Sequence, residues 1–270
     1  MPGLFETARR NLSRGLTDLA IFEIGHVYLP SDGASHGTQD LPPGAVELDP
    51  EVLAGLTDSL PAQPRRVAVL FLGDVVPRQP GAAAVASGLA EALDAAAEVG
   101  LALAADIRPV TGTHPVLHPG RTAELRVGDT VVGVAGELLP SRARELDLPG
   151  VVAVAELDLD ALLAAGATQI AARPIGTLPA ATQDLSLVVS ADVPAADVRD
   201  AVVEGAGDLL EDARLVDDYR GPGVPEGSKS LTFALRFRGP DRTLTAAEAT
   251  EAKLAGVALA EARLGAALRD

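Results

Sequence analysis

The stretch KSLTFALRFR at residues 229–238 decides the fold of the second half of this 270-residue chain. Every second residue in it is large and apolar, and a period of two is typical of a strand with one buried face. The apolar side is formed by Leu231, Phe233, Leu235 and Phe237, and the polar side by Ser230, Thr232, Arg236 and Arg238. The stretch therefore predicts a half-buried strand whose polar side is open to a ligand.

Working outward from this strand, the neighbouring segments predict a complete small domain. A Pro- and Gly-rich loop at 221–227 separates it from an earlier strand at 213–220, and Thr245 with Glu248 forms a capping box that begins a helix to about residue 264. We expect three further elements, which are a strand at 184–190, a helix from Pro194 to 205 and a last short strand at 266–269. The order β-α-β-β-α-β is that of a ferredoxin-like domain, in which both helices cover one sheet face.

The first half predicts a second α+β unit, a mostly antiparallel sheet with helices to one side. We expect a central strand within 17–30 and other strands at 66–73, 101–107, 122–127, 130–137 and 151–157. The helices are expected at 1–13, 50–60, 81–99 and 140–146. Residues 160–180 are interpreted as a linker, which gives two domains, 1–172 and 173–270.

Composition limits the classes of function. The net charge is −16, and both halves carry more acidic than basic residues, so any contact with nucleic acid has to be local. There is no Cys, which excludes disulfides and thiolate sites. The absence of Cys fits a cytoplasmic location, and because no stretch of about 18 apolar residues occurs, the sequence predicts no membrane span.

Several motifs, taken together and in order, resemble the C-terminal part of the bacterial phenylalanyl-tRNA synthetase β subunit. In the first half they are LSRGLTDLAIFEIGHVY (12–28), LHPGRTAEL (117–125), VGVAGELLP (132–140) and VAELDLDAL (154–162). In the second half they are DLSLVV (184–189), LVDDYRG (215–221) and PEGSKSLTFALRFRGPDRTLT (225–245). The first group is similar to the family's class II synthetase-like module, and the second to its ferredoxin-fold anticodon-binding domain.

The resemblance implies a function and partners. The chain would bind the tRNA(Phe) anticodon and scaffold the catalytic α subunit of an (αβ)2 ligase, whose ATP and Mg²⁺ belong to the holoenzyme rather than to this chain. The family's tRNA-binding, editing and helical-bundle modules would precede residue 1, so residues 1–172 would be an N-terminally truncated core. A different class of function, a stand-alone protein–protein or regulatory module, is favoured by the net charge and by Gln183, where the family usually has Arg.

No catalytic residue and no metal site are expected. The strand at 18–29 has no Arg to hold an ATP phosphate, so Glu23 is interpreted as structural. His114 and His118 are four residues apart, but Pro115, Pro119 and Gly120 forbid the helix that would pair them on a metal. We interpret HPGR instead as a tight turn, with Arg121 anchoring the next strand or an acid of a partner chain.

The candidate RNA-binding residues lie on the two central strands of the second domain. Asp217 and Tyr219 are two apart and share a face, as do Ser230 and Arg236 on the next strand. Single-stranded RNA is read by aromatic stacking and by polar groups at the base edge. The resemblance places Asp217, Tyr219 and Ser230 at the family's positions for the first anticodon base.

Basic residues near these positions leave two alternatives. Arg220, Lys229, Arg236, Arg238 and Arg242 form either a local basic strip that contacts phosphates, or solvated charges paired with Asp217, Asp218 and Glu226.

Overall fold

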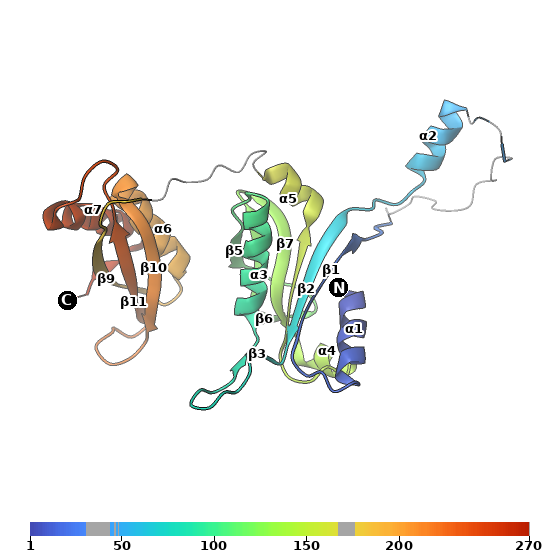
Figure 1. Ribbon diagram of the computed structural model, residues 1–270, viewed down its shortest axis with the longest axis horizontal. Helices are drawn as coiled ribbons and strands as arrows, with labels where there is room; N and C mark the ends of the chain where they lie inside the picture. The colour runs from blue at the N-terminus through green and yellow to red at the C-terminus, as the bar shows by residue number, and fades with distance from the viewer. Residues whose placement is uncertain (31–43, 46, 48, 167–175, 270) are drawn as a thin grey trace. The chain divides into compact units, whose positions relative to one another are not determined.

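The computed structural model describes residues 1–30, 44, 45, 47, 49–166 and 176–269. The chain divides into two compact units, Met1–Ala171 and Ala172–Asp270 (Figure 1). The domain boundary expected near residue 172 lies outside the described residues. Each unit is an α+β fold built on its own antiparallel sheet, as the sequence predicted.

A six-stranded antiparallel sheet forms the first unit, in the order β1-β2-β8-β7-β6-β5. These strands are β1 (Leu19–His26), β2 (Arg65–Leu72), β8 (Val152–Asp158), β7 (Thr130–Leu138), β6 (Leu117–Val127) and β5 (Arg108–Thr111). The stretch 17–30 was expected to be a central strand, and this prediction was wrong because, among the described strands, β1 pairs only with β2 and lies at the sheet edge. Apolar residues that suggested burial, such as Phe22, are instead exposed.

Helices cover both faces of this sheet, which corrects the expectation of helices on one side. Helices α1 (Pro2–Leu12) and α4 (Pro140–Glu145) pack on one face, and α3 (Leu89–Ala102) and α5 (Leu159–Ala165) on the other (Figure 1). The reason lies in β2 and β8, whose nearly continuous apolar sequences supply side chains to both faces. Helix α2 (Pro50–Asp58), between β1 and β2, has no buried residue.

Three local predictions in the first unit were wrong. The helix expected from residue 81 begins at Leu89, because β3 (Asp74–Val76) and β4 (Val85–Ala86) first form a small ribbon. It then continues to Ala102, into the stretch predicted as a strand, and the strand β5 follows only at Arg108. The expected linker at 160–180 begins with helix α5, which the Asp158 side chain caps by accepting from the Ala161 N–H.

The second unit has the predicted β-α-β-β-α-β order. Its sheet runs β10-β11-β9-β12, made of β10 (Leu210–Tyr219), β11 (Ser228–Phe237), β9 (Ala181–Ser190) and β12 (Ala267–Leu268). Helices α6 (Ala195–Ala206) and α7 (Ala246–Leu264) cover one face, and a short 3-10 turn (Gly207–Leu209) follows α6.

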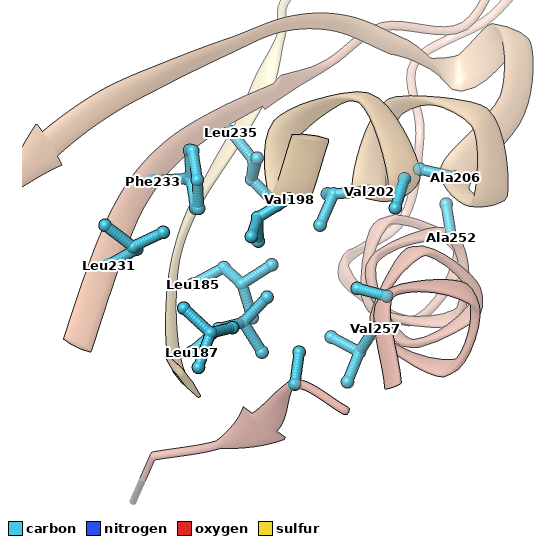
Figure 2. Packing of buried hydrophobic residues seen from close by; sticks show 14 of the residues in the cluster. Leu185, Leu187, Val198, Val202, Ala206, Leu231, Phe233, Leu235, Ala252 and Val257 are labelled. Atoms are coloured by element: carbon cyan, nitrogen blue, oxygen red, sulfur yellow. The ribbon is translucent and has the colours of Figure 1, made fainter. Parts of the chain in front are cut away.

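The core of the second unit lies between this sheet and its two helices. Figure 2 shows Val198 and Val202 of α6 and Val257 of α7 turned towards strand side chains. The buried strand residues are Leu185, Leu187, Val189, Leu231, Phe233, Leu235 and Phe237. The alternation in 229–238 therefore predicted the buried side of β11 correctly, and its other side is not covered by a helix.

Candidate nucleic-acid interface

The helix-free side of the second sheet is the candidate interface, and we call it the open face. Neighbouring residues across paired strands point to the same side of a sheet, so the register identifies the members of this face. One row runs across Tyr219, Ser230, Val188 and Ala267, and the next across Asp217, Thr232 and Ser186. Arg269 lies at the end of the second row, since its N–H donates to the Ser186 carbonyl at 2.9 Å.

A bulge in β10 sets which residues reach the open face. Leu215 is paired with Phe233 on the helix side, and the next pair is Asp217 with Thr232, so Val216 is an extra residue without a partner. A bulge of this kind shifts the alternation of the strand by one residue. If Val216 were instead paired with Thr232 in regular alternation, Asp217 and Tyr219 would point towards the helices.

The Tyr219 side chain makes one contact through its hydroxyl and one over its ring. Its hydroxyl donates to the Pro222 carbonyl at 3.2 Å, and the Arg269 guanidinium lies 5.3 Å from the ring centroid, within the range of a cation–π contact. Arg269 was missed by the sequence reasoning. The signal was available in the expected last strand at 266–269, which in a ferredoxin-like sheet pairs beside the first strand.

Ser230 lies next to Tyr219 and is almost completely covered, with 1% of its surface exposed. Its hydroxyl has no hydrogen-bond partner among the described residues. Beside it, the hydroxyls of Ser186 and Thr232 lie 3.0 Å apart and satisfy each other. Asp217 is exposed at the β10 edge, where its carboxylate is accessible to a ligand.

The basic residues near the interface do not form a continuous strip. Arg220 pairs with Asp218 at 3.1 Å, a contact that lowers the pKa of the Asp218 carboxyl and raises that of the guanidinium. Arg236 binds Glu211 at 2.7 Å, so it also has an acidic partner.

The other basic candidates have an acidic partner or lie elsewhere. Arg238 also contacts Glu211, and Arg242 pairs with Glu248. The structure therefore favours the alternative of paired charges, although the acids differ from those expected for three of the five. Lys229 is 5% exposed and opposite Val189, which places it on the helix side of β11, away from the other candidates.

Gln183 also lies on the helix side of the sheet. Its side-chain amide donates to the Thr250 hydroxyl of α7 at 3.0 Å. The departure from the expected Arg therefore concerns packing between strand and helix, and does not change the open face.

In the first unit, the HPGR segment was predicted to be a tight turn, but it lies within β6, in the stretch where the pairing with β7 is irregular between Leu117 and Thr122. Its Arg121 donates to Glu137 of the same chain at 2.6 Å, which raises the pKa of the guanidinium. The rings of His114 and His118 each accept an N–H from the residue two further on. Over the part of the chain that the structure describes, no group of three or more potential metal ligands occurs, and no helix is long and apolar enough to cross a membrane.

Comparison with protein families identifies this arrangement. Residues 176–269 match the model of the ferredoxin-fold anticodon binding domain, so fold and open face together define a chain of the aminoacyl-tRNA synthetase class. Residues 1–159 match the model of the phenylalanyl tRNA synthetase beta chain CLM domain. The chain belongs to the phenylalanyl-tRNA synthetase beta chain family.

Curated relatives agree along the whole chain. It is 58% identical to the phenylalanine–tRNA ligase beta subunit of Leifsonia xyli subsp. xyli, 45% to that of Mycolicibacterium paratuberculosis and 42% to that of Thermobifida fusca. Each match includes 100% of this chain but only 32% or 33% of the relative, so the chain spans about a third of these proteins.

Among solved structures, pyrrolysyl-tRNA synthetase from Desulfitobacterium hafniense aligns with a TM-score of 0.37 and 18% identity. The alignment covers 60% of this chain and 46% of that one. This similarity is too low to support a statement about fold.

Proposed function

We propose that this chain binds the anticodon of tRNA(Phe) on the open face of its second unit and scaffolds the catalytic α subunit of a phenylalanine–tRNA ligase. The observation that carries the RNA part is the placement of Tyr219, Asp217 and Ser230 in adjacent rows of one sheet face. An aromatic ring beside hydrogen-bonding groups suits an unstacked base that is read at its edge. The chain itself contributes no catalytic residue, and the ATP and Mg²⁺ of the reaction are assigned to the partner.

Electrostatics favours a local mode of RNA binding. Because Arg220 and Arg236 are paired with acids and the chain carries a net charge of −16, general attraction to phosphates contributes little. Stacking on Tyr219 and hydrogen bonds to Asp217 and Ser230 therefore carry most of the affinity. These groups read a single base, and we propose that it is the first base of the anticodon.

Binding of the full chain to a tRNA(Phe) anticodon stem-loop tests this part. We expect Tyr219→Ala to weaken binding by about 10- to 100-fold, since stacking contributes about 1–3 kcal/mol per base. The matched control is Tyr28→Ala, which removes the other tyrosine of the chain. Equal affinity of the two variants, or indifference to a change of the first anticodon base, would contradict the proposal.

The scaffolding part rests on the apolar edge of the first sheet. Phe22 and Ile24 are 70% and 60% exposed, and they lie opposite Val69 and Val67 of β2. Helix α3 packs over β2, β7 and β8. Phe22 and Ile24 continue the same apolar sheet face onto the edge strand β1, which α3 does not cover. An uncovered apolar edge of this kind is typical of a protein–protein interface.

Co-purification with a phenylalanyl-tRNA synthetase α chain tests this second part. Replacing both Phe22 and Ile24 by Ser should abolish the complex, whereas Leu101→Ser should preserve it, since Leu101 is 72% exposed on α3. The assembly is proposed as (αβ)2, which light scattering of the complex measures. If neither RNA nor the α chain binds, the stand-alone regulatory module becomes the better account.

A further inference from the structure

The contact between Arg269 and Tyr219 joins opposite edges of the second sheet. Tyr219 belongs to β10, the first strand in spatial order, while Arg269 directly follows β12, the last. Neighbouring strands lie about 4.8 Å apart, so three spacings separate these backbones by about 14 Å. The two side chains can meet only by extending across the open face, above β11 and β9.

Ser230 lies beneath this contact. It is the β11 residue in the same row as Tyr219, on a side of the sheet that no helix covers, and yet it is 1% exposed and its hydroxyl has no described partner. A buried hydroxyl without a partner is costly in a folded protein. We attribute its burial to the ring and the guanidinium, and a ligand at this position would satisfy its hydroxyl.

Both halves of the contact are anchored, Arg269 at its backbone and Tyr219 at its hydroxyl end. The Arg269 N–H is bonded to the Ser186 carbonyl, which fixes the start of the side chain. The loop after β10 folds against the ring: a Cβ on Gly221 would lie 2.5 Å from the Tyr219 hydroxyl oxygen. Among the described residues, no carboxylate lies within ion-pair distance of Arg269, and its guanidinium contacts the Tyr219 ring instead.

We infer that Arg269 and Tyr219 form a lid over Ser230, closed in the free protein and opened by the entering nucleotide. This inference rests on the proposed RNA function and deepens it. On opening, the ring exchanges the guanidinium for a base, Ser230 becomes accessible to the base edge, and the guanidinium turns to a phosphate. The exchange is feasible because an exposed cation–π contact changes an equilibrium only about two- to fivefold, less than stacking of a base.

The lid has a direct spectroscopic signature. A guanidinium over an aromatic ring experiences its ring current, so the Nε–H proton of Arg269 should resonate upfield in the free full-length chain. Tyr219→Leu should remove this shift, whereas Tyr28→Leu should preserve it. Without RNA, Arg269→Ala should increase acrylamide quenching of Tyr219 fluorescence, measured in a Tyr28→Phe background. Arg263→Ala is the matched control, because Arg263 pairs with Glu204 between the helices.

Titration with the tRNA(Phe) anticodon stem-loop completes the test. We expect the Arg269 resonance to lose its upfield shift at saturation. If the RNA binds and the shift remains, Arg269 stays on the ring and the lid is overturned while the RNA function stands. If the free chain has no upfield shift and Arg269→Ala leaves quenching unchanged, the lid is overturned without RNA. If the wild-type chain and Arg269→Ala both fail to bind RNA, the proposed function is overturned, and the lid with it.

Discussion

At the scale of single residues, loss of the Ser230 hydroxyl should change folding stability and RNA affinity in opposite directions. It is buried without a described partner, so Ser230→Ala removes an unsatisfied group and leaves the surrounding packing in place. We expect the free energy of unfolding to rise by about 1 kcal/mol, while affinity for the stem-loop falls. Denaturant melts and binding titrations of the same variant check both. A loss of stability would contradict the structure at this position.

Glu248 gives a pH-dependent prediction. Hydrogen bonds from Arg242 and then from the Thr245 N–H lower the pKa of its carboxyl from 4.5 to about 2. A group with a depressed folded pKa stabilises the fold above its ordinary pKa, and this contribution disappears as the pH falls from about 4.5 towards 2.

Glu248→Gln should therefore lower the melting temperature of the second unit at pH 7, and the difference from the wild type should shrink steadily below pH 4.5. Thermal melts across this range measure it. Glu251→Gln is a suitable control, because Glu251 lies one turn further along α7 and its carboxyl has no ion pair among the described residues. A difference independent of pH would argue against the ionic contact.

The residue pattern gave only part of the candidate interface. Spacing alone placed Asp217 and Tyr219 on one face of their strand, but no spacing predicts that Val216 is a bulge, and the bulge decides that this face is the open one. Arg269 is 50 positions from Tyr219, so their contact depends on the closing of the sheet. Lys229 lies on the helix side of β11, opposite Val189, and the strand alternation in 229–238 already indicated this placement.

At the scale of elements, α6 and α7 cross at two glycines. A Cβ on Gly256 would lie 2.6 Å from the Val202 carbonyl oxygen, and one on Gly205 would lie 2.7 Å from that of Ala255. The two backbones are therefore in direct contact, an approach that larger residues prevent.

Gly256→Ala tests this crossing. Intrinsic helix propensity alone would favour Ala by about 1 kcal/mol, but the clash with backbone should reverse the sign and destabilise the second unit by about 1–3 kcal/mol. Gly55→Ala, in α2 with nothing within 4 Å, is the matched control and should increase helicity without a penalty. Equal effects of the two substitutions would exclude the close crossing.

Prediction of elements succeeded where local and tertiary signals agree. The alternation in β11 is compatible only with a half-buried strand, and the capping box of α7 marks the start of a helix. Both elements form within a few residues of the expected bounds. The predicted element bounds within residues 81–107 were wrong because the local sequence, which is rich in Ala, does not mark where the helix begins and ends. Contacts with β7 and β8 decide where α3 lies.

At the scale of the whole molecule, charge predicts how RNA binding depends on salt. The chain has 38 acidic and 22 basic side chains, and most cations near the open face are already paired. We expect one or two phosphate contacts, and therefore a slope of about −1 to −2 when the logarithm of the binding constant is plotted against that of salt concentration. Titrations between 50 and 200 mM salt, the range in which this dependence is usually followed, measure it. A much steeper slope would indicate a basic surface that the described residues do not form.

The unpaired Val216 also determines how evolution can alter the length of β10. Substitutions at this exposed position leave the pairing of its neighbours intact, and deletion of the residue would do so too, because Asp217 would then follow Leu215 in simple alternation and stay opposite Thr232. Tyr219 would remain opposite Ser230 on the open face. Val216 is therefore a position at which β10 can lose a residue without turning its ligand-facing side chains into the interior.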